Sequence, residues 1–242
     1  MPKTIVVTSG KGGTGKSTVS LLLARALCAQ GKNILLIEMD SGLRGLDLML
    51  GLSDRVLFDL ADILLGRCAP AKAILPVDVR CGNLHIIAAP MDRLYIPDTD
   101  KLTSLLYQLS YCYDMMILDA AAGVGKAFDA AAAVSDAALV VTQCEPVALR
   151  DAAAASSMLQ DHAPRLVINR FLRRQLTGEI IDLDEAIDRA GARLIAVIPE
   201  DPPAAAACAL KDPPNTPAIR AIFDLARRLS GEDVLLNTRD LK

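Results

Sequence analysis

Short, continuous apolar runs alternate along the chain with segments in which apolar residues recur every three or four positions. The continuous runs are typical of strands buried on both faces. They occupy residues 4–8, 33–38, 84–89, 113–119, 137–143, 165–171 and 193–201. Segments with helical spacing, or rich in alanine, occupy residues 19–27, 57–65, 101–111, 127–134, 152–155, 183–190 and 217–229. The alternation predicts an α/β fold, with a doubly wound, mostly parallel sheet and helices on both faces.

The length and composition suit one large domain. We expect this domain over residues 1–230 of the 242, followed by a short C-terminal tail over residues 231–242. Hydrophobic residues make up 52% of the chain, which excludes a disordered protein, but the longest apolar stretches fall short of the roughly 18 residues that span a membrane. The first strand begins directly after the N-terminus, without the regions of a signal peptide, so we expect a cytoplasmic protein.

The cysteines and the net charge argue against some classes of function. The chain has six cysteines, at Cys28, Cys68, Cys81, Cys112, Cys144 and Cys208. They form no C-x-x-C pair, and most lie in apolar segments where a thiol behaves as a small hydrophobic group, so we expect no metal cluster and no disulfide. The net charge of -3 and the pI of about 5.4 give no general attraction to nucleic acid.

A glycine-rich segment, S-G-K-G-G-T-G-K-S-T at residues 9–18, separates the first predicted strand from the first predicted helix. It fits the pattern G-x-x-x-x-G-K-[ST], in which glycines let the backbone wrap closely enough for its N–H groups to point at phosphate oxygens. The phosphates then lie at the N-terminus of the helix, with Lys16 on the β- and γ-phosphates and Ser17 on Mg²⁺. The predicted binding residues are Gly10, Lys11, Gly12, Gly13, Thr14, Gly15, Lys16, Ser17 and Thr18.

Two of the later strands are followed by, or end in, an acidic residue. Asp40 stands two residues after the end of the strand at residues 33–38, and Asp119 closes the strand at residues 113–119. Ligands of open parallel sheets bind outside the carboxyl ends of the strands, so both carboxylates are expected beside the phosphates. The apolar strand that ends in Asp119 has the form of a Walker B strand, and we expect Asp119 to hold a water molecule on Mg²⁺.

The loop carries a second lysine, Lys11, although Lys16 and the backbone already serve the phosphates. The segment G-K-G-G-T-G-K-S-T resembles the deviant Walker A loop of the MinD/ParA group of P-loop ATPases, and the similarity to the MinD family covers nearly the whole chain. The resemblance implies the P-loop NTPase fold, ATP and Mg²⁺ as cofactors, and a homodimer in the ATP state. It also implies that Lys11 crosses the dimer interface to the nucleotide of the partner subunit.

The segment D-S-G-L-R-G-L-D at residues 40–47 resembles a second stretch of the MinD family. The resemblance implies that Asp40 acts on the attacking water, and we include Asp40 among the metal-site residues. Glu38 stands where the family has a further aspartate, so the sequence departs from the pattern here. Arg44 is either a solvated loop charge or a residue near the phosphates or the dimer face.

Two segments that follow predicted strands also resemble the family. Gly123 closes A-A-A-G where MinD has S-P-A-G, and its backbone amide is expected to approach the γ-phosphate. Ala120 and Ala121 replace the serine and proline, so we expect a looser loop and an altered turnover rate. Residues 145–151, E-P-V-A-L-R-D, resemble the start of the helix on which MinD regulators dock, with ordinary helix capping as the alternative.

The last two predicted strands supply the candidate base pocket. In the family, the asparagine of V-I-N-R bonds the edge of adenine, and here that residue is Asn169, whose amide has both the donor and the acceptor needed. Arg170 follows it, and we include Arg170 among the nucleotide-binding residues. Pro199, Glu200 and Asp201 are expected to form the wall of the pocket.

The resemblance implies a slow ATPase that acts as a molecular switch in cell-division site selection or a related positioning process. The alternatives are a ParA-like DNA-partition or cargo-partition ATPase, disfavoured by the acidic balance, and a weakly hydrolysing regulatory scaffold. An iron-sulfur carrier ATPase of the same fold lacks the C-x-x-C pair. The partners then expected are regulatory proteins that dock near residues 145–151.

The C-terminal tail and two pairs of arginines lead to expectations about the protein surface. MinD reaches the membrane through a basic amphipathic C-terminal helix, whereas residues 231–242 have three acids, two bases and no aromatic residue. We therefore expect weak or indirect membrane association, and peripheral location at the inner face of the membrane stays open. The arginine pairs at residues 173–174 and 227–228 are expected on solvated faces.

Overall fold

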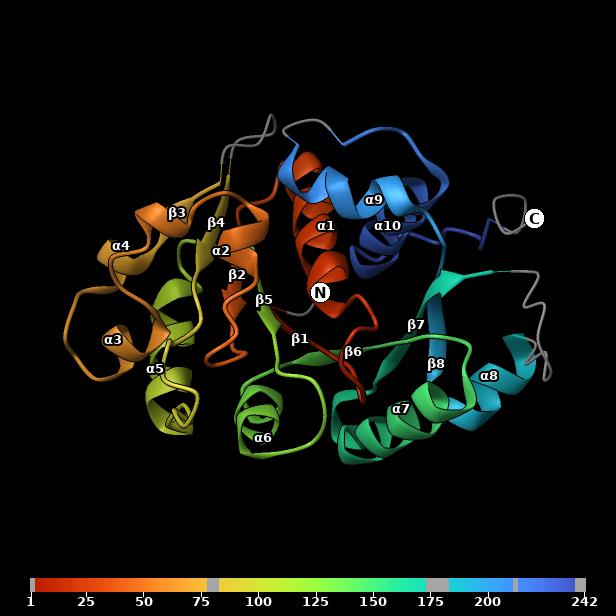
Figure 1. Ribbon diagram of the computed structural model, residues 1–242, viewed down its shortest axis with the longest axis horizontal. Coiled ribbons are helices and arrows are strands. Elements are labelled where there is room, and N and C mark those ends of the chain that lie inside the picture. The colour runs from red at the N-terminus through yellow and green to blue at the C-terminus, as the bar shows by residue number, and fades with distance from the viewer. Residues whose placement is uncertain (1–2, 78–82, 173–182, 211–212, 238–242) are drawn as a thin grey trace.

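The computed structural model describes residues 3–77, 83–172, 183–210 and 213–237, and it contains one eight-stranded sheet. The strand order is β3-β4-β2-β5-β1-β6-β7-β8. Helices cover both faces: α1, α9 and α10 lie on one side, and α5, α6, α7 and α8 lie on the other (Figure 1). The predicted α/β class, with a doubly wound and mostly parallel sheet, is confirmed.

The strands lie close to their predicted positions. Their bounds are β1 Thr4–Thr8, β2 Ile34–Glu38, β3 Leu75–Pro76, β4 Leu84–Ile87, β5 Met115–Asp119, β6 Ala137–Thr142, β7 Arg165–Phe171 and β8 Arg193–Pro199. All neighbouring pairs are parallel except β3 and β4, which are antiparallel. The pattern did not predict β3, because a strand of two residues that ends in proline has no periodicity to detect.

The helices differ more from their predicted bounds. They are α1 Lys16–Ala29, α2 Leu46–Met49, α3 Leu60–Leu64, α4 Pro70–Ala73, α5 Thr99–Leu109, α6 Lys126–Ala133, α7 Pro146–Met158, α8 Leu183–Ala190, α9 Pro202–Ala206 and α10 Pro217–Leu229. Short 3₁₀ turns occupy η1 Ser53–Arg55, η2 Gln160–His162 and η3 Ala207–Ala209. The prediction at residues 57–65 was too long at the start, because the Asp59 side chain caps α3 in a capping box with Asp62.

Two hydrophobic layers hold the sheet, and their residues explain the continuous apolar runs. Val6 of β1 faces the layer formed with α3, α5, α6, α7 and α8. Its neighbours Ile5 and Val7 face the other layer, formed with α1 and α10. All three side chains are fully buried, because both faces of the sheet are covered. A strand buried in this way reads as an uninterrupted apolar run rather than an alternating one.

The sheet order brings the candidate site residues to one edge. β1 lies between β5 and β6, and β5 lies between β1 and β2, so the carboxyl ends of β1, β5 and β2 are adjacent. Asp119 pairs in register with Val7 on one side and with Glu38 on the other. The glycine-rich loop after β1 and the acids after β2 and β5 therefore meet at this edge, which is a topological switch point of the sheet.

The first part of the tail lies against the domain. Arg228 donates from Nε to the carbonyl oxygen of Val234 and from Nη2 to that of Leu235, both at 2.8 Å, and from Nη1 to that of Ile195 in β8 at 3.0 Å. Arg227 forms an ion pair of 2.7 Å with Glu232. The predicted solvated face is therefore wrong for Arg228, whose guanidinium holds the tail on the edge strand. The arginine pair at residues 173–174 lies outside the described residues.

Among the described residues, no helix has the length and the apolar character needed to cross a membrane. The tail residues 231–237 form no helix, and residues 238–242 lie outside the described part of the chain.

Candidate functional site

The glycine-rich loop packs against two other segments so closely that side chains could not be added. A Cβ atom at Gly10 would lie 2.1 Å from the carbonyl oxygen of Asp151 in α7. A Cβ atom at Gly15 would lie 2.3 Å from Nδ2 of Asn169, and Gly15 also has a φ of 90°. Gly10 and Gly15 are thus required by close contacts, and Gly13 and Gly15 by their positive φ. Helix α1 begins at Lys16, earlier than the predicted residue 19, because Gly15 ends the loop in the left-handed conformation.

Lys16 and Asp119 form the centre of the site. Nζ of Lys16 lies 2.9 Å from Oδ1 of Asp119, and the two side chains are only 7% and 0% exposed. The same ammonium group is 3.2 Å from Oγ of Ser17. A buried ion pair of this kind is stable only when the geometry is good and the charges stay paired. The sequence predicted all three residues, and the fold brings them together at the start of α1.

Asp119 has one oxygen without a hydrogen-bond partner in the described part of the chain. Its Oδ1 accepts bonds from Lys16 and from Oγ of Ser20, the latter at 2.8 Å, whereas the buried Oδ2 accepts none. A buried carboxylate oxygen left open beside a serine hydroxyl fits a site for Mg²⁺, which is held by one or two protein oxygens together with phosphates and water. The described residues contain no group of three or more histidine, cysteine or acidic side chains that could hold a metal alone.

Asp40 lies within the electrostatic reach of this pair. Partial burial raises the pKa of the Asp40 carboxyl above its usual value, and the negative charge of Asp119 raises it further, while Lys16 opposes both effects. The predicted grouping of Asp40 with Lys16 and Asp119 is therefore present. Like-charged carboxylates that share one lysine favour an additional cation at the site.

Glu38 performs a task that the sequence did not reveal. Its buried Oε1 accepts from the backbone N–H groups of Gly45 and Leu46, the latter at 3.0 Å, and its Oε2 accepts from Ala89 at 3.4 Å. Burial raises the pKa of Glu38, while these backbone bonds lower it. The Glu38 carboxylate thus joins the loop after β2 to the end of β4, and it holds the loop that carries Asp40.

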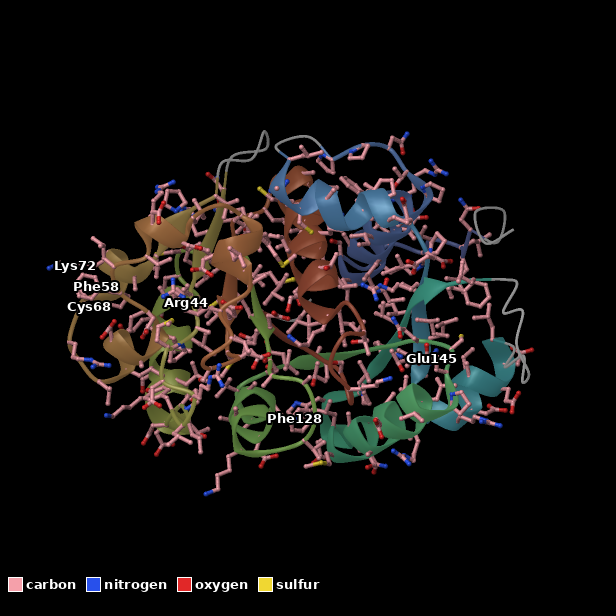
Figure 2. The ribbon with its side chains drawn as sticks, viewed as in Figure 1. Arg44, Phe58, Cys68, Lys72, Phe128 and Glu145 are labelled. Atoms are coloured by element: carbon pink, nitrogen blue, oxygen red, sulfur yellow. The ribbon has the colours of Figure 1, made fainter. Side chains whose placement is uncertain are left out.

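The structure contradicts the first of the two alternatives for Arg44, a solvated loop charge, and leaves a place near the phosphates or the dimer face a prediction. It has a φ of 33°, and its guanidinium pairs with Asp47, whose side chain is buried. Figure 2 shows Arg44 in the segment between β2 and α2. Because the side chain of Arg44 is only 17% exposed, it is not a solvated loop charge. In this arrangement its partner is Asp47 rather than a group of the glycine-rich loop.

Lys11 points away from the buried pair. Its Nζ lies 3.7 Å from Oε2 of Glu145, which precedes α7, and both side chains are about half exposed. Figure 2 shows Glu145 at the beginning of α7. A role of Lys11 separate from that of Lys16 stays a prediction. The segment at residues 145–151, which opens the predicted regulator-docking helix, therefore contacts the glycine-rich loop at Lys11 through Glu145 and at Gly10 through Asp151.

A cavity of about 360 Å³ extends from the loop to the end of β8. The residues that line it are Gly15, Thr18, Val19, Leu22, Asn169, Arg170, Ile198, Pro199, Glu200, Asp201, Pro202, Ala204, Ala218 and Ile222. Every residue predicted for the base pocket is among them. Nδ2 of Asn169 donates to the carbonyl oxygen of Thr14 at 2.8 Å, so the asparagine also secures the loop. Arg170 lies 4.0 Å from Glu200, and its Nη1 is 3.4 Å from the carbonyl oxygen of Gly13.

The loop after β5 is tied to the strand that precedes the glycine-rich loop. The amide of Ala120 donates to the carbonyl oxygen of Val7 at 3.0 Å, and that of Gly123 donates to the carbonyl oxygen of Ser9 at 2.8 Å. The Gly123 amide is thus occupied within the chain in this arrangement, and the predicted contact with a γ-phosphate requires that bond to open. The effect of the alanine substitutions on turnover stays a prediction.

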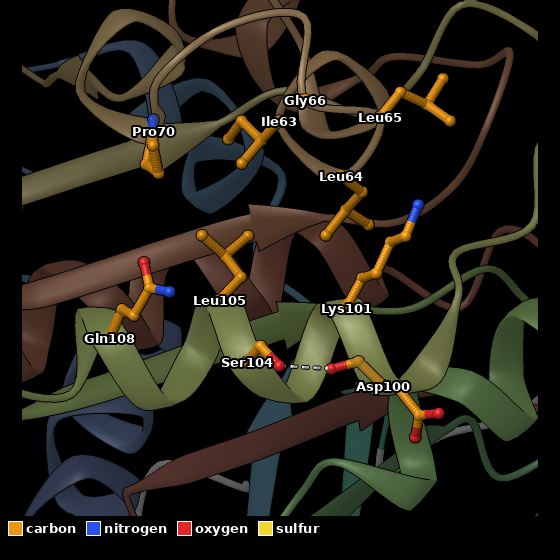
Figure 3. A pocket seen from close by; sticks show the side chains of 10 residues that line it. All are labelled: Ile63, Leu64, Leu65, Gly66, Pro70, Asp100, Lys101, Ser104, Leu105 and Gln108. Atoms are coloured by element: carbon orange, nitrogen blue, oxygen red, sulfur yellow. Dashed lines mark hydrogen bonds between the residues drawn. The ribbon is translucent and has the colours of Figure 1, made fainter.

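A larger cavity of about 540 Å³ lies away from these residues. Figure 3 shows Lys101, Ser104 and Leu105 of α5 facing Ile63 and Leu64 of α3 across it. Its walls combine four Ile and Leu side chains with four polar or charged ones, and they contain no part of the glycine-rich loop. Volume alone therefore does not identify the site; the buried charged pair and the tight glycine loop do.

The doubly wound sheet, the glycine-rich loop at its switch point and the buried pair of Lys16 and Asp119 define a P-loop nucleotide-binding protein. A sequence profile of the AAA domain family matches residues 2–163. The septum site-determining protein MinD of Bacillus subtilis (strain 168) is 33% identical, over 98% of this chain and 92% of that protein. The chain belongs to the MinD family of septum site-determining ATPases, as the resemblance predicted.

Solved structures of the same family agree with the fold. MinD in the MinC:MinD cell division protein complex of Aquifex aeolicus is 32% identical, with a TM-score of 0.85 over 97% of this chain and 98% of that one. MinD of Pyrococcus horikoshii OT3, solved with Mg-ADP, is 30% identical, with a TM-score of 0.82 over 95% and 96% of the two chains. Nucleotide and Mg²⁺ binding is thus a property of the family.

Proposed function

We propose that this protein binds MgATP, forms a dimer in the ATP state and hydrolyses ATP slowly, as a switch in cell-division site selection. The observation that carries the proposal is the buried pair of Lys16 and Asp119, in which one carboxylate oxygen has no hydrogen-bond partner among the described residues and the ammonium group also contacts Oγ of Ser17. In a protein that only needed a stable core, such a pair would add little, because burying two charges costs about as much as their attraction returns. The presence of this buried pair therefore favours a role in binding.

The residues of the site divide the chemistry among them. Lys16 exchanges its contact with Asp119 for the phosphates, and the N–H groups of the glycine-rich loop point at the phosphate oxygens. Ser17 and Asp119 are the residues that would hold Mg²⁺, with Asp40 nearby, and the bound cation would offset charge on the phosphoryl oxygens. Asp40 orients the attacking water. Asn169, with Arg170 and the wall formed by residues 199–201, binds the adenine base.

Lys11 acts on the second subunit. In the single chain it is half exposed and pairs with Glu145 over 3.7 Å, an interaction of the exposed kind that contributes little to stability. Lys11 can therefore leave Glu145 at small cost and reach the nucleotide of the partner subunit. The ATP-dependent dimer rests on this exchange.

The protein partners are proposed from the relatives. One relative was solved as a MinC:MinD complex, and we propose that this chain likewise binds a regulatory protein, near residues 145–151. The contacts of α7 with Gly10 and Lys11 support the proposal, because a protein bound to this helix would act directly on the nucleotide loop. We propose residues 1–230 as the ATPase domain and residues 231–242 as the tail. Membrane association is weak or proceeds through a partner.

The experiment that tests the proposed function combines sizing and turnover. Sedimentation with ATP and Mg²⁺ is expected to show a dimer, and with ADP a monomer, while released phosphate shows slow hydrolysis. Lys11→Ala should retain ATP binding and stay monomeric, because its lysine serves the other subunit. The matched control is Lys101→Ala, which removes an exposed lysine of α5. A normal ATP-dependent dimer of the Lys11 variant would contradict the exchanged-lysine proposal, and dimers without hydrolysis would indicate a scaffold.

A further inference from the structure

Asp119 has two carboxylate oxygens in very different surroundings. Its Oδ1 accepts two bonds, from Nζ of Lys16 at 2.9 Å and from Oγ of Ser20 at 2.8 Å. Its Oδ2 is buried and accepts no bond from the described residues. The carboxylate is fully buried, so solvent water does not bond to both oxygens and make their surroundings alike. Something must fix which oxygen is engaged and which is open, and Lys16 and Ser20 are the two side chains that do so.

Only one of these two partners can stay with Asp119 during nucleotide binding. Under the proposed function, the ammonium group of Lys16 turns to the phosphates, and Oδ1 then loses its charged partner. Ser20 lies one helical turn after Lys16 in α1, and its side chain is fully buried. Its single hydroxyl hydrogen lies within reach of two acceptors, Oδ1 of Asp119 at 2.8 Å and the carbonyl oxygen of Lys16 at 3.0 Å, and the charged carboxylate is the stronger acceptor.

We propose that Ser20 is a positioning residue for Asp119: its hydroxyl keeps Oδ1 engaged, so that Oδ2 is presented to the cation when Lys16 moves to the phosphates. This inference rests on the proposed nucleotide site and deepens it. The glycine-rich loop motif ends before Ser20, and no sequence motif includes this serine. Its partner is 99 residues away in the chain.

The proposal predicts an effect on the cation and not on the phosphates. Without the Ser20 hydroxyl, Asp119 keeps its charge but loses the bond that fixes its orientation, and the departure of Lys16 would leave Oδ1 buried and unpaired. Binding of Mg²⁺ then has to order the carboxylate as well. The contacts of Lys16, and of the loop N–H groups, with the phosphates do not involve Ser20, so nucleotide binding without a divalent cation should be preserved.

The test uses Ser20→Ala in the full chain, with a fluorescent ADP analogue as the probe. Binding is measured over a series of Mg²⁺ concentrations and again in EDTA. We expect the half-saturating Mg²⁺ concentration to rise about tenfold, while affinity in EDTA changes less than about twofold. The matched control is Ser135→Ala, because Oγ of Ser135 also lies within bonding distance of a helical carbonyl four residues back, that of Ala131 at 2.7 Å, and forms no hydrogen bond with an acid among the described residues.

Two further variants separate positioning from a general packing role. Ser20→Thr keeps the hydroxyl and is expected to restore the wild-type Mg²⁺ dependence. In an Asp119→Asn background, Ser20→Ala should cause no additional change, because the two residues act through one bond. Thermal melts of each variant check that it is folded.

The outcomes of these binding measurements distinguish a failure of the inference about Ser20 from a failure of the proposed function. Equal Mg²⁺ dependence of Ser20→Ala and the wild type overturns the inference and leaves the proposed function intact. A loss of affinity of the same size in EDTA also overturns it, because the role of Ser20 is then structural. If the wild type binds no nucleotide with or without Mg²⁺, the proposed function fails, and the inference fails with it.

Discussion

The proposed nucleotide site has a phosphate end, at the buried pair of Lys16 and Asp119, and a base end, at the cavity that reaches the end of β8, and the charges of the two ends differ in their exposure to water. At the phosphate end, Lys16 and Asp119 form a buried ion pair of 2.9 Å with side chains that are 7% and 0% exposed. At the base end, Arg170 and Glu200 lie 4.0 Å apart, and their side chains are 49% and 33% exposed. Charges excluded from water interact strongly with a further charge, whereas exposed charges are screened. We therefore expect the affinity for the nucleotide to come from the phosphate end and the selectivity among nucleotides to come from the base end.

The largest effect on ATP affinity is expected from Lys16→Ala, at the phosphate end. The variant removes the cation that faces both Asp119 and the phosphates, so we expect ATP affinity to fall at least about a hundredfold, from a loss of roughly 3 kcal/mol. Titration with a fluorescent ATP analogue measures the effect. Lys72→Ala is the control, because Lys72 is exposed and lies at the left edge of the molecule in Figure 2. Unchanged affinity in Lys16→Ala would contradict the P-loop assignment.

Asp40→Ala separates chemistry from binding within the phosphate end. Asp40 is half-buried and bonds no loop amide in the described residues, so ATP affinity and the dimer should persist within about threefold. Turnover should fall about a hundredfold, because the attacking water loses the group that orients it. Phosphate release under saturating ATP measures this, with exposed Asp54→Ala as the control. Wild-type turnover would show that Asp40 does not act on the water.

Asn169→Ala probes the base end. The amide group of Asn169 has a donor and an acceptor for adenine, and its Nδ2 also donates to the carbonyl oxygen of Thr14. We expect affinity for ATP to fall about tenfold, from the loss of roughly 1.4 kcal/mol, and the preference for ATP over GTP to weaken. Competition binding with both nucleotides measures this, and Asn215→Ala, on the surface before α10, is the control. If the ATP preference is kept, Asn169 serves only to hold the loop.

The smallest effect is expected from Glu200→Gln. The variant removes the charge that faces Arg170 without changing the shape of the cavity wall. Because the pair is exposed, the free energy of unfolding should change by less than about 1 kcal/mol and the ATP affinity by less than about twofold. Urea unfolding and nucleotide titration measure the two quantities. An effect as large as that of Lys16→Ala would remove the distinction between the two ends.

The sequence predicted the residues of the phosphate end more completely than their contacts. The pairing of Lys16 with Asp119 across 103 positions was inferred only as common proximity to the phosphates. Ser20 was missed because a serine within an apolar helix carries no motif, and Glu38 because its backbone partners lie in two separate loops. Arg228 was assigned to a solvated face because its acceptors are carbonyl groups, which every residue has.

The sequence by itself determined the first strand, the glycine-rich loop and the existence of the helix after it, because these depend on neighbouring residues and on backbone conformations open to glycine. It also determined the alternation of strands and helices, since apolar spacing follows from local geometry. Only the tertiary structure decided which oxygen of Asp119 is engaged, that Asn169 holds the loop at Thr14, and that Glu38 joins two loops. These contacts depend on the strand order, which brings distant segments to one edge of the sheet and leaves no mark in the local pattern.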